Sequence, residues 1–528
     1  MKHAVREDDI TRDIPLKVLA SVLLALPWLN PFATGPSPAV APWLFSLACS
    51  AACLVALAGA THARLARATA WAWLAAALIS TGIGLLQYFG VSALFSPWVN
   101  VTGTGEAFAN LRQRNQFATL TNTGLAALIW VAMHWQSQSK SGFAAAAPAG
   151  RAAALSVASV GPAVSAASLA AAALLAVGNA ASSSRTGLVQ LILLLVLFAL
   201  WGGLRRAVVR RILFAAALAY VAGSVALPLL AGLDPASTGI LARLHDGGPA
   251  CGSRLILWRN VLHLITLRPW LGWGWGELDY AHFTTLYEGL RFCEILDNAH
   301  NLPLHLAVEL GVPAALLVCG TGVWLAWRAK PWREQNAVRQ MAWSVLAVIL
   351  LHSLLEYPLW YGPFQMAFVL CLLLLRRRPP DAAHATMVEE KMPVKLAKYA
   401  WAATFLVAAG AFAAWDYHRI SQIFLPPDSR SPAYRDNTLD KIRGSWLFSN
   451  QVRFAEFVTT PLTRDNAARV NAMAHQLLHY SPEARVAEKL IESAVMLGRD
   501  DEALLFLARY RAAFPAEHAR WAKRQAPG

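Results

Sequence analysis

Charged residues are scarce in this chain. Only 15% of its 528 residues are Asp, Glu, Lys or Arg, whereas 56% are hydrophobic and 21 are Trp. This composition excludes an ordinary soluble globular domain, because such domains carry about a quarter charged residues. The sequence therefore predicts an integral membrane protein.

The sequence also lacks the short motifs of common hydrolases and metal enzymes. It contains no HExxH, no paired CxxC, no P-loop and no GxSxG. Metalloprotease, ATP-hydrolysing and serine-hydrolase activities lose support, because each of those chemistries depends on residues at such a spacing. We therefore expect no metal site and no cofactor.

Long apolar runs are abundant. A membrane-spanning helix needs about 20 mostly apolar residues. Eleven such runs lie near residues 16–33, 41–60, 69–90, 116–134, 153–179, 186–203, 211–232, 302–327, 339–356, 359–376 and 396–416. We expect the first run to remain as a span, because it follows a charged stretch and no small-residue cleavage site follows it. The pattern predicts an all-α, polytopic membrane protein with about eleven transmembrane helices.

Basic residues are distributed by loop. If the N-terminus is cytoplasmic, the inside segments hold 21 Lys or Arg and the outside loops between spans hold 8. The inside segments are 1–17, 61–68, 135–152, 204–211, 328–339 and 377–395, with the flanking Arg376. This is the positive-inside distribution. The net charge of +15 is therefore a topology signal, and it predicts no nucleic-acid partner.

Five polar clusters fall on the outer side in this topology. They are residues 108–120, 181–187, 252–260, 297–301 and 355–361. The outer loop 233–301 is far longer than any other connection between spans. Loops beyond about 12 to 15 residues are usually functional or disordered. Helical periodicity near residues 253–270 and an aromatic, glycine-broken segment at 271–280 favour a functional loop.

The six cysteines fall into two groups. Cys49, Cys53, Cys319 and Cys371 lie inside apolar runs, where small packing residues are expected. Cys251 and Cys293 share the long outer loop. In an oxidising compartment these two thiols could pair, but the sequence leaves open whether their Cα atoms lie within bonding reach.

The composition changes after the last apolar run. Residues 417–528 are polar, and residues 481–515 have the pattern of a helical hairpin. Ser481 is expected to cap the first helix, Gly498 to end it, and Asp500 or Asp501 to start the second. The pattern is tetratricopeptide-like, and the alternatives are a small packed domain or a docking platform for a polypeptide. We predict two domains, a transmembrane domain at 1–416 and a helical domain at 417–528 on the outer side.

The outer face carries several arginines and one well-placed histidine. The planar guanidinium suits bidentate recognition of phosphate oxygens, and an imidazole can accept a proton near neutral pH. Together they favour group transfer from a phosphate-linked donor. Singly, such an arginine is more often an anchor and such a histidine more often a structural residue.

The order of the motifs resembles a known superfamily. "LRQRNQFATL", Ser-Arg-Thr at 184–186, an Arg-bearing helix in the long loop, "AHNLPLHLAVELGVPAAL" and "HSLLEYPLWYGPF" occur in turn. This order resembles the O-antigen ligase and polymerase superfamily. The first motif and "LLEYPLWY", followed by an extra span and a helical tail, are most similar to bacterial protein O-oligosaccharyltransferases of the pilin-glycosylating type.

The resemblance implies a glycosyltransferase of the bacterial inner membrane, with its active site and C-terminal domain in the periplasm. Such an enzyme moves an oligosaccharide from undecaprenyl pyrophosphate to Ser or Thr hydroxyls of exported proteins such as pilins, without a nucleotide sugar. The implied partners are the lipid-linked donor, a protein acceptor and membrane lipids. The alternatives are an O-antigen ligase acting on lipid A core and an O-antigen polymerase. A flippase is disfavoured because the predicted spans are nearly free of charge at their centres.

The resemblance also implies roles for individual residues. His300 would deprotonate or orient the acceptor hydroxyl, while Arg185 and Arg254 would hold the pyrophosphate and stabilise the leaving group. Supporting roles fall to Asp297 and Asn301 beside the imidazole, to Arg112, Gln113, Arg114 and Asn115 at the donor, and to Glu356 and Tyr357 at the outer end of the ninth span. The alternative interpretation makes these residues helix caps and interfacial anchors. His305, a turn deeper, is expected to be a structural partner or, alternatively, the catalytic histidine.

Overall fold

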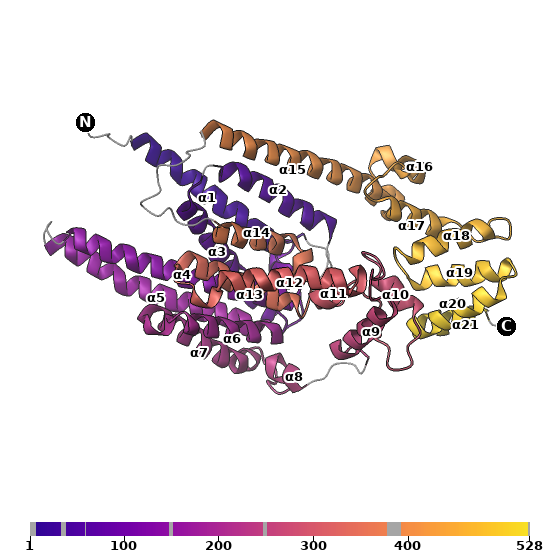
Figure 1. The fold of residues 1–528 in the computed structure, drawn as a ribbon, viewed down its shortest axis with the longest axis horizontal. Coiled ribbons are helices and arrows are strands. Elements are labelled where there is room, and N and C mark those ends of the chain that lie inside the picture. Colours follow the sequence, from indigo (N-terminus) through magenta and orange to yellow (C-terminus); the bar gives the residue numbers. More distant parts are fainter. Residues whose placement is uncertain are drawn as a thin grey trace. The chain divides into compact units, whose positions relative to one another are not determined.

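The computed structural model describes residues 7–32, 39–58, 60–146, 151–245, 251–376 and 392–525 (Figure 1). These residues form helices joined by loops and turns, with no strand among them. The predicted all-α class is confirmed. The predicted basic segments 1–17, 135–152 and 377–395 lie partly outside the described residues.

The chain divides into two compact units. The first comprises residues 1–246, 327–353 and 358–410, and the second comprises residues 247–326, 354–357 and 411–528. Most of the long outer loop therefore groups with the C-terminal helices. The predicted domain boundary after residue 416 falls close to the start of the last stretch of the second unit.

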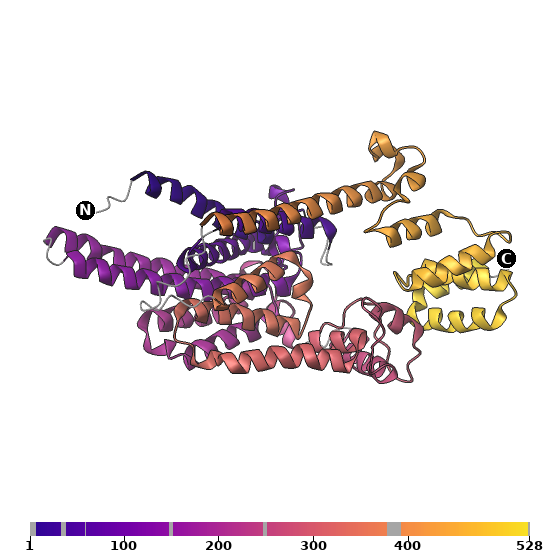
Figure 2. The same cartoon turned by 45° about the horizontal axis from the view of Figure 1, so that its top comes forward.

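The first unit is a bundle of apolar helices. Its helices are α1 (Glu7–Leu29), α2 (Val40–Ala56), α3 (His62–Tyr88), α4 (Arg114–Ala146), α5 (Arg151–Ala181), α6 (Arg185–Leu200), α7 (Ala207–Leu230), α8 (Gly239–His245), α13 (Ala337–Ser353), α14 (Gly362–Arg376) and most of α15 (Met392–Ser421). The long helices α4 and α5 run side by side, as Figure 2 shows from a second direction.

Small residues bring these helices close together. A Cβ atom on Gly124 of α4 would lie 2.3 Å from the Cβ of Ala77 on α3. A Cβ on Gly178 of α5 would lie 2.6 Å from the Thr81 hydroxyl. Close backbone approach at small residues is the usual basis of helix packing in membranes, so α3 is held tightly against α4 and α5.

Several described helices suit a membrane. Four segments are long and apolar enough to cross one, namely His62–Tyr88, Arg114–Gln138, Ala207–Leu230 and Val312–Arg333. Shorter apolar helical segments are Val18–Leu29, Val40–Ala56, Ser165–Ala181, Arg185–Leu200, Ala337–Ser353 and Gly362–Arg376. The chain is a multi-pass membrane protein, and the number of eleven spans stays a prediction.

One predicted span is wrong in its boundaries. The apolar run at 302–327 is interrupted at Gly311, which separates α11 (Leu302–Leu310) from α12 (Val312–Ala329). Gly311 has φ +87°, and a Cβ there would lie 2.1 Å from the Trp270 carbonyl oxygen. Only glycine meets both demands, so the chain turns at this point. The candidate span begins at Val312.

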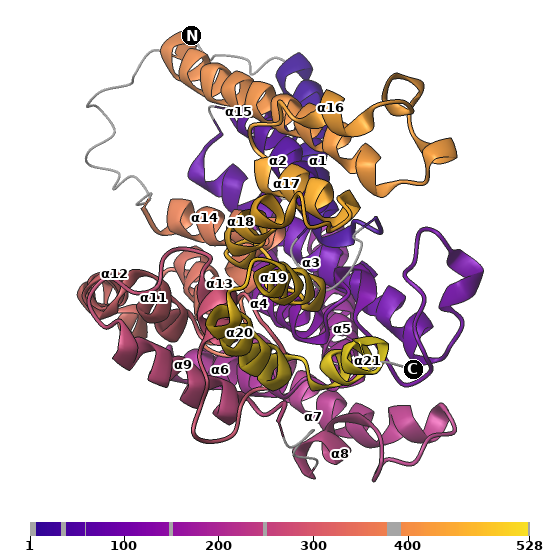
Figure 3. The ribbon, with the colours of Figure 1, turned by 90° about the vertical axis from the view of Figure 1, so that its right-hand side faces the viewer.

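The second unit contains two groups of short helices. They are α9 (Arg254–Leu267), α10 (Leu278–Thr284), α11, the larger part of α12 and the end of α15, then α16 (Thr438–Ile442), α17 (Ser449–Thr459), α18 (Ala467–Leu478), α19 (Ala484–Met496), α20 (Asp500–Ala513) and α21 (Pro515–Gln525). Leu264, Ala281 and Val308 pack in one apolar core. In the tail, α18, α19 and α20 pack one after another (Figure 3).

The predicted hairpin in the tail is confirmed, with one correction. Gly498 has φ +68° and separates α19 from α20, which begins at Asp500. Ser481 does not cap α19, whose N-cap is Glu483. The Ser481 hydroxyl donates to Glu483 Oε1 at 3.0 Å instead of accepting from a backbone N–H group.

Candidate active site

The polar segment before α11 fixes the backbone around His300. Asn301 is the N-cap of α11, and its Oδ1 accepts from the Leu304 N–H at 3.1 Å. Its Nδ2 donates to the Leu354 carbonyl at 3.0 Å. The His300 N–H donates to Asn298 Oδ1 at 2.9 Å, and His300 itself has φ +50°. This conformation is uncommon outside glycine, so two asparagines hold the histidine in a defined orientation.

The carboxylate of Glu356 contacts both His300 and Arg254, which are far apart in the sequence. Glu356 Oε2 lies 2.6 Å from His300 Nδ1, and Glu356 Oε1 accepts from Arg254 Nη2. Arg254 is the first residue of α9, which begins after the N-cap Ser253. Tyr357 packs edge-on against the imidazole, with ring centroids 4.9 Å apart. We call Arg254, His300 and Glu356 the histidine cluster.

The imidazole of His300 is neutral at physiological pH. Burial, with a contribution from the positive charge of Arg254, lowers the pKa of His300 to about 4. Because Nδ1 faces a carboxylate, we assign the ring proton to Nδ1. Nε2 then carries the lone pair, and it makes no hydrogen bond within the part of the chain that the structure describes.

The cluster has the parts of an oriented general base. Glu356 holds the ring through Nδ1 and can stabilise the imidazolium that forms when Nε2 takes a proton. Arg254 neutralises the same carboxylate, and its side chain is 38% exposed, compared with 10% for Glu356. A partly exposed guanidinium of this kind can also bind phosphate oxygens.

A second cluster of predicted residues lies in the first unit, at the start of α4 and α6. The Ser184 hydroxyl donates to Asn115 Oδ1 at 2.6 Å and accepts from the Gly187 N–H at 2.9 Å. This contact joins the motif around Arg112 to the motif around Arg185. We call Arg112, Arg114, Asn115 and Arg185 the arginine cluster.

The arginines of this cluster differ in their contacts. Arg112 Nη2 donates to Asn100 Oδ1 at 2.7 Å, and Arg114 lies 3.7 Å from Glu106. Arg185 is exposed and makes no hydrogen bond or ion pair with any described residue. It is the first residue of α6, where backbone N–H groups and the helix dipole favour an anion. Gln113 has a local role, because its Oε1 accepts from the Gln116 N–H at 2.6 Å.

The structure also shows a buried polar network that the sequence did not reveal. In the first unit, Thr119 Oγ1 lies 2.9 Å from His352 Nδ1 and accepts from Gln190 Nε2 at 2.8 Å. Asn122 Nδ2 donates to the Gly187 carbonyl at 3.0 Å. The spacing of Thr119 and Asn122 by three residues was the available signal, because it places both on one helix face. The network links α4, α6 and α13.

The long loop is closed by a disulfide bond. The structure pairs Cys251 with Cys293, with Cα atoms 5.2 Å apart. The Cys293 N–H also donates to the Cys251 carbonyl at 3.3 Å. The bond links the residues just before Arg254 to the segment that precedes His300. Cys49, Cys53 and Cys371 are buried free thiols, and Cys319 is a half-buried one.

Asp297 and His305 lie close to His300 in the sequence, but neither makes a hydrogen bond with its imidazole. Burial raises the pKa of Asp297, and the imidazole of His300 contacts Glu356 instead of this carboxyl. His305 is buried, with its Nε2 3.5 Å from Glu309 Oε2.

The sequence did not single out two carboxyl groups near this segment, those of Glu309 and Asp279. Burial is the main cause that raises the pKa of Asp279 to about 7, and Asp297 adds to it. Among the described residues, no three His, Cys, Asp or Glu side chains are grouped as metal ligands.

Three family models match successive parts of the chain. Residues 107–131 match the model described as Protein glycosylation ligase. Residues 170–319 match O-Antigen ligase. Residues 340–527 match Virulence factor membrane-bound polymerase, C-terminal. The first segment contains Arg112, Arg114 and Asn115. The second contains Arg185, Arg254 and His300. The third contains Glu356 and the C-terminal helices.

One similar protein is a General O-oligosaccharyltransferase of Acinetobacter baylyi. It is 22% identical over 203 residues, and the match covers 36% of this chain and 34% of that protein. The chain thus matches about a third of that relative's length. No solved structure matches the chain. The resemblance that the order of motifs predicts is confirmed by these matches.

Proposed function

We propose that the chain is a glycosyltransferase that moves an oligosaccharide from a lipid pyrophosphate to a hydroxyl group of an exported protein. The observation that carries the proposal is the neutral imidazole of His300, held through Nδ1 by Glu356 with Nε2 available. The matches to glycan ligase models and to an O-oligosaccharyltransferase support this reaction class.

The proposed step is a displacement at the anomeric carbon of the glycan. His300 Nε2 takes the proton of the acceptor hydroxyl while the hydroxyl oxygen forms the new glycosidic bond. The bond from the anomeric carbon to the pyrophosphate oxygen breaks, and the lipid pyrophosphate leaves with the electron pair. Glu356 stabilises the imidazolium, and the guanidinium of Arg254 stabilises charge on the leaving group.

We assign the arginine cluster to the same donor. Arg185 has an exposed guanidinium at a helix N-terminus, which is a favourable site for a phosphate. The assignment to this reaction rests on the sequence order of the motifs, and Arg112, Gln113, Arg114 and Asn115 accompany Arg185 in that role.

The proposed acceptor is a Ser or Thr hydroxyl of a periplasmic or exported protein, pilins being the class that the sequence resemblance indicates. The match at 107–131 to a protein glycosylation ligase favours a protein acceptor. The match at 170–319 to an O-antigen ligase keeps lipid A core as the second candidate, and polymerase activity as a third.

The proposed location is the bacterial inner membrane, with the histidine cluster and the C-terminal helices in the periplasm and the N-terminus in the cytoplasm. The Cys251–Cys293 bond supports this orientation, because disulfides persist in oxidising compartments such as the periplasm. The donor in that compartment would be undecaprenyl-pyrophosphate-linked oligosaccharide.

Co-expression tests the acceptor. The chain is expressed with a lipid-linked glycan pathway in cells that lack their own ligase, and periplasmic proteins are analysed by mass spectrometry while lipopolysaccharide is analysed on gels. Glycan on Ser or Thr of a pilin-like protein is expected, and the His300→Ala variant is the control. Glycan on lipid A core alone would replace the protein acceptor by the ligase reaction.

A further inference from the structure

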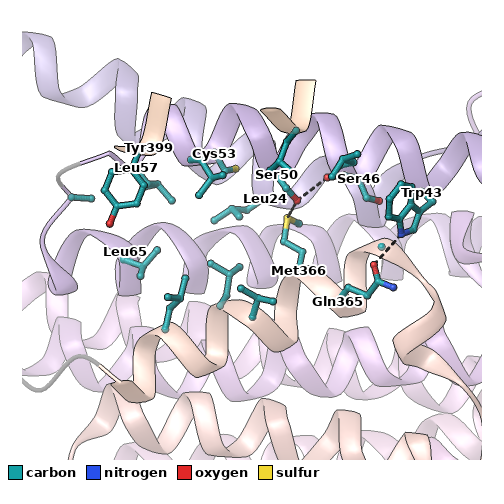
Figure 4. Close-up of a pocket in the computed structure, with 18 residues that line it drawn as sticks. Leu24, Trp43, Ser46, Ser50, Cys53, Leu57, Leu65, Gln365, Met366 and Tyr399 are labelled. Atoms are coloured by element: carbon teal, nitrogen blue, oxygen red, sulfur yellow. Dashed lines mark hydrogen bonds between the residues drawn. The ribbon is translucent and has the colours of Figure 1, made fainter. Parts of the chain in front are cut away.

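An elongated apolar groove lies in the first unit (Figure 4). Its volume is about 490 Å³, and α1, α2, α3, α14 and α15 all contribute to its lining. Ligand pockets are commonly about 300–1,000 Å³ in volume. The groove is therefore large enough to hold part of a ligand chain.

The groove follows the length of α2. Its lining extends from Trp43 and Gln365 at one end to Leu57 and Tyr399 at the other (Figure 4). Fourteen residue steps along a helix, at about 1.5 Å each, give a length of about 21 Å. This is most of the hydrocarbon thickness of a bilayer, which is about 30 Å. An extended hydrocarbon chain fits this shape.

The interior of the groove presents few polar atoms. The Ser46 hydroxyl donates to the Pro42 carbonyl at 3.0 Å, and the Ser50 hydroxyl donates to the Ser46 carbonyl at 2.8 Å. The Ser50 hydroxyl also lies 3.5 Å from Met366 Sδ on α14, so both serine hydroxyls already have partners (Figure 4). Six leucine, valine and methionine side chains of α2 and α14 also line the groove, and Leu24, Leu65 and Leu406 do so from α1, α3 and α15. Burial of apolar surface would stabilise the binding of a ligand segment in this groove.

One end of the groove is polar and leads toward the arginine cluster. There the Trp43 indole N–H donates to Gln365 Oε1 at 3.1 Å. A smaller adjoining cavity shares Trp43, Ser46 and Gly362 with the groove and is bounded by Asn110, Leu111 and Gln116. These last three residues flank the segment 112–115 on both sides. The adjoining cavity is small, about 50 Å³, and its lining includes these sequence neighbours of residues 112–115. The Trp43 end of the groove is therefore the end that we assign to the arginine cluster.

We propose that this groove binds the polyprenyl chain of the lipid-linked donor, with the pyrophosphate end toward Trp43 and residues 112–115. The proposal rests on the proposed function. A phospholipid acyl chain would share the apolar lining, but it gives no reason for a second cavity that adjoins the groove beside the sequence neighbours of Arg112. The groove and the arginine cluster together recognise an isoprenoid chain that ends in phosphate.

Binding to the full chain in lipid nanodiscs tests the groove. Labelled undecaprenyl phosphate is the probe, with geranyl phosphate and phosphatidylglycerol as competitors. Ser50→Phe fills the groove and is expected to weaken undecaprenyl phosphate binding about tenfold, because buried methylene contacts are lost. The weak binding of geranyl phosphate should not change. Ala48→Phe is the matched control, because Ala48 is exposed on the same helix and does not line the groove.

Three outcomes would overturn the proposal. They are equal binding to Ser50→Phe and wild type, equal loss in Ala48→Phe, and displacement of the probe by phosphatidylglycerol as readily as by unlabelled undecaprenyl phosphate. If Ser50→Phe does not fold, photocrosslinking decides. The Leu54→p-benzoylphenylalanine variant should form an adduct with undecaprenyl phosphate, and absence of that adduct counts against the groove.

Glycan transfer is measured on the same preparations, so that the two proposals can fail separately. Loss of probe binding in Ser50→Phe, without transfer by any variant, supports the groove and contradicts the proposed function. Transfer by wild type, with unchanged probe binding in Ser50→Phe, contradicts the groove and supports the proposed function.

Discussion

The Nδ1 atom of His300 lies 2.6 Å from a carboxylate oxygen of Glu356. The two residues are 56 positions apart in sequence, and the same carboxylate accepts from Arg254. From this contact we assign the ring proton to Nδ1, which leaves Nε2 as the basic atom. The chemistry proposed for the chain depends on this arrangement.

Glu356→Gln should lower kcat strongly while the protein remains folded. The amide keeps the shape of the carboxylate but removes the negative charge that stabilises the imidazolium, so a loss of about 100- to 10,000-fold is expected. Rate measurements at saturating donor check this loss, and size-exclusion chromatography checks the fold. A variant with the rate of the wild type would exclude Glu356 from orienting the base.

The pH dependence of kcat/KM should show an acid limb near pH 4. Protonation of Nε2 removes the lone pair, so activity falls as pH falls through the pKa of His300, which is lowered to about 4. A histidine of ordinary pKa would lose activity below about pH 6.5. Rates from pH 3.5 to 8 locate the limb, after a control in which enzyme held at each pH is returned to pH 7. A limb at pH 6 to 7 would contradict the neutral, buried imidazole.

Arg254→Ala should reduce transfer far more than Arg259→Ala. Arg254 contacts Glu356, whereas Arg259 is an exposed arginine of the same helix. Loss of a charged group that stabilises a leaving group typically costs about 100- to 1,000-fold in kcat. Transfer by purified variants at matched donor concentration gives the comparison. Equal effects of the two substitutions would show that only the general charge of α9 matters.

Arg185→Ala is expected to reduce transfer, and Arg185→Lys to restore only part of it. Lys keeps the positive charge but not the bidentate geometry of the guanidinium. The readout is kcat and the donor KM for each variant. Full activity in Arg185→Ala would remove the arginine cluster from the proposed reaction.

Cysteine labelling in whole cells tests the orientation. Thr104→Cys and Ser237→Cys should react with an impermeant thiol reagent, whereas Ala207→Cys, in the basic segment 204–211, should not. All three positions are exposed. Cys49, Cys53 and Cys371 are buried and Cys251 is bonded to Cys293, but Cys319 is a half-buried free thiol. It is therefore replaced by Ser in every variant, and the chain without an added cysteine gives the background. Labelling of position 207 alone would invert the proposed topology.

The sequence predicted the all-α class of the fold, and it named Arg254, His300 and Glu356, which the structure brings together. Apolar runs identified helices because burial in lipid demands apolar side chains over a helix's length, but they did not show the turn at Gly311. That turn depends on contact with the Trp270 backbone, which only the folded chain brings near. Residue type and order pointed to His300 and Arg254. The partner of the imidazole was expected among its neighbours Asp297 and Asn301, whereas the structure supplies Glu356 and uses Asn301 as a helix cap.

Transfer by the His300→Ala variant tests the central proposal most directly. Purified wild type and variant are given the same lipid-linked donor and acceptor protein, and product is quantified by mass spectrometry under single-turnover conditions. Removal of the base is expected to slow transfer by about 100- to 10,000-fold while binding of donor is retained. His305→Ala, measured in parallel, should retain transfer, because His305 is not assigned as the base. Transfer by His300→Ala at the rate of the wild type would contradict the assignment of His300 as the base.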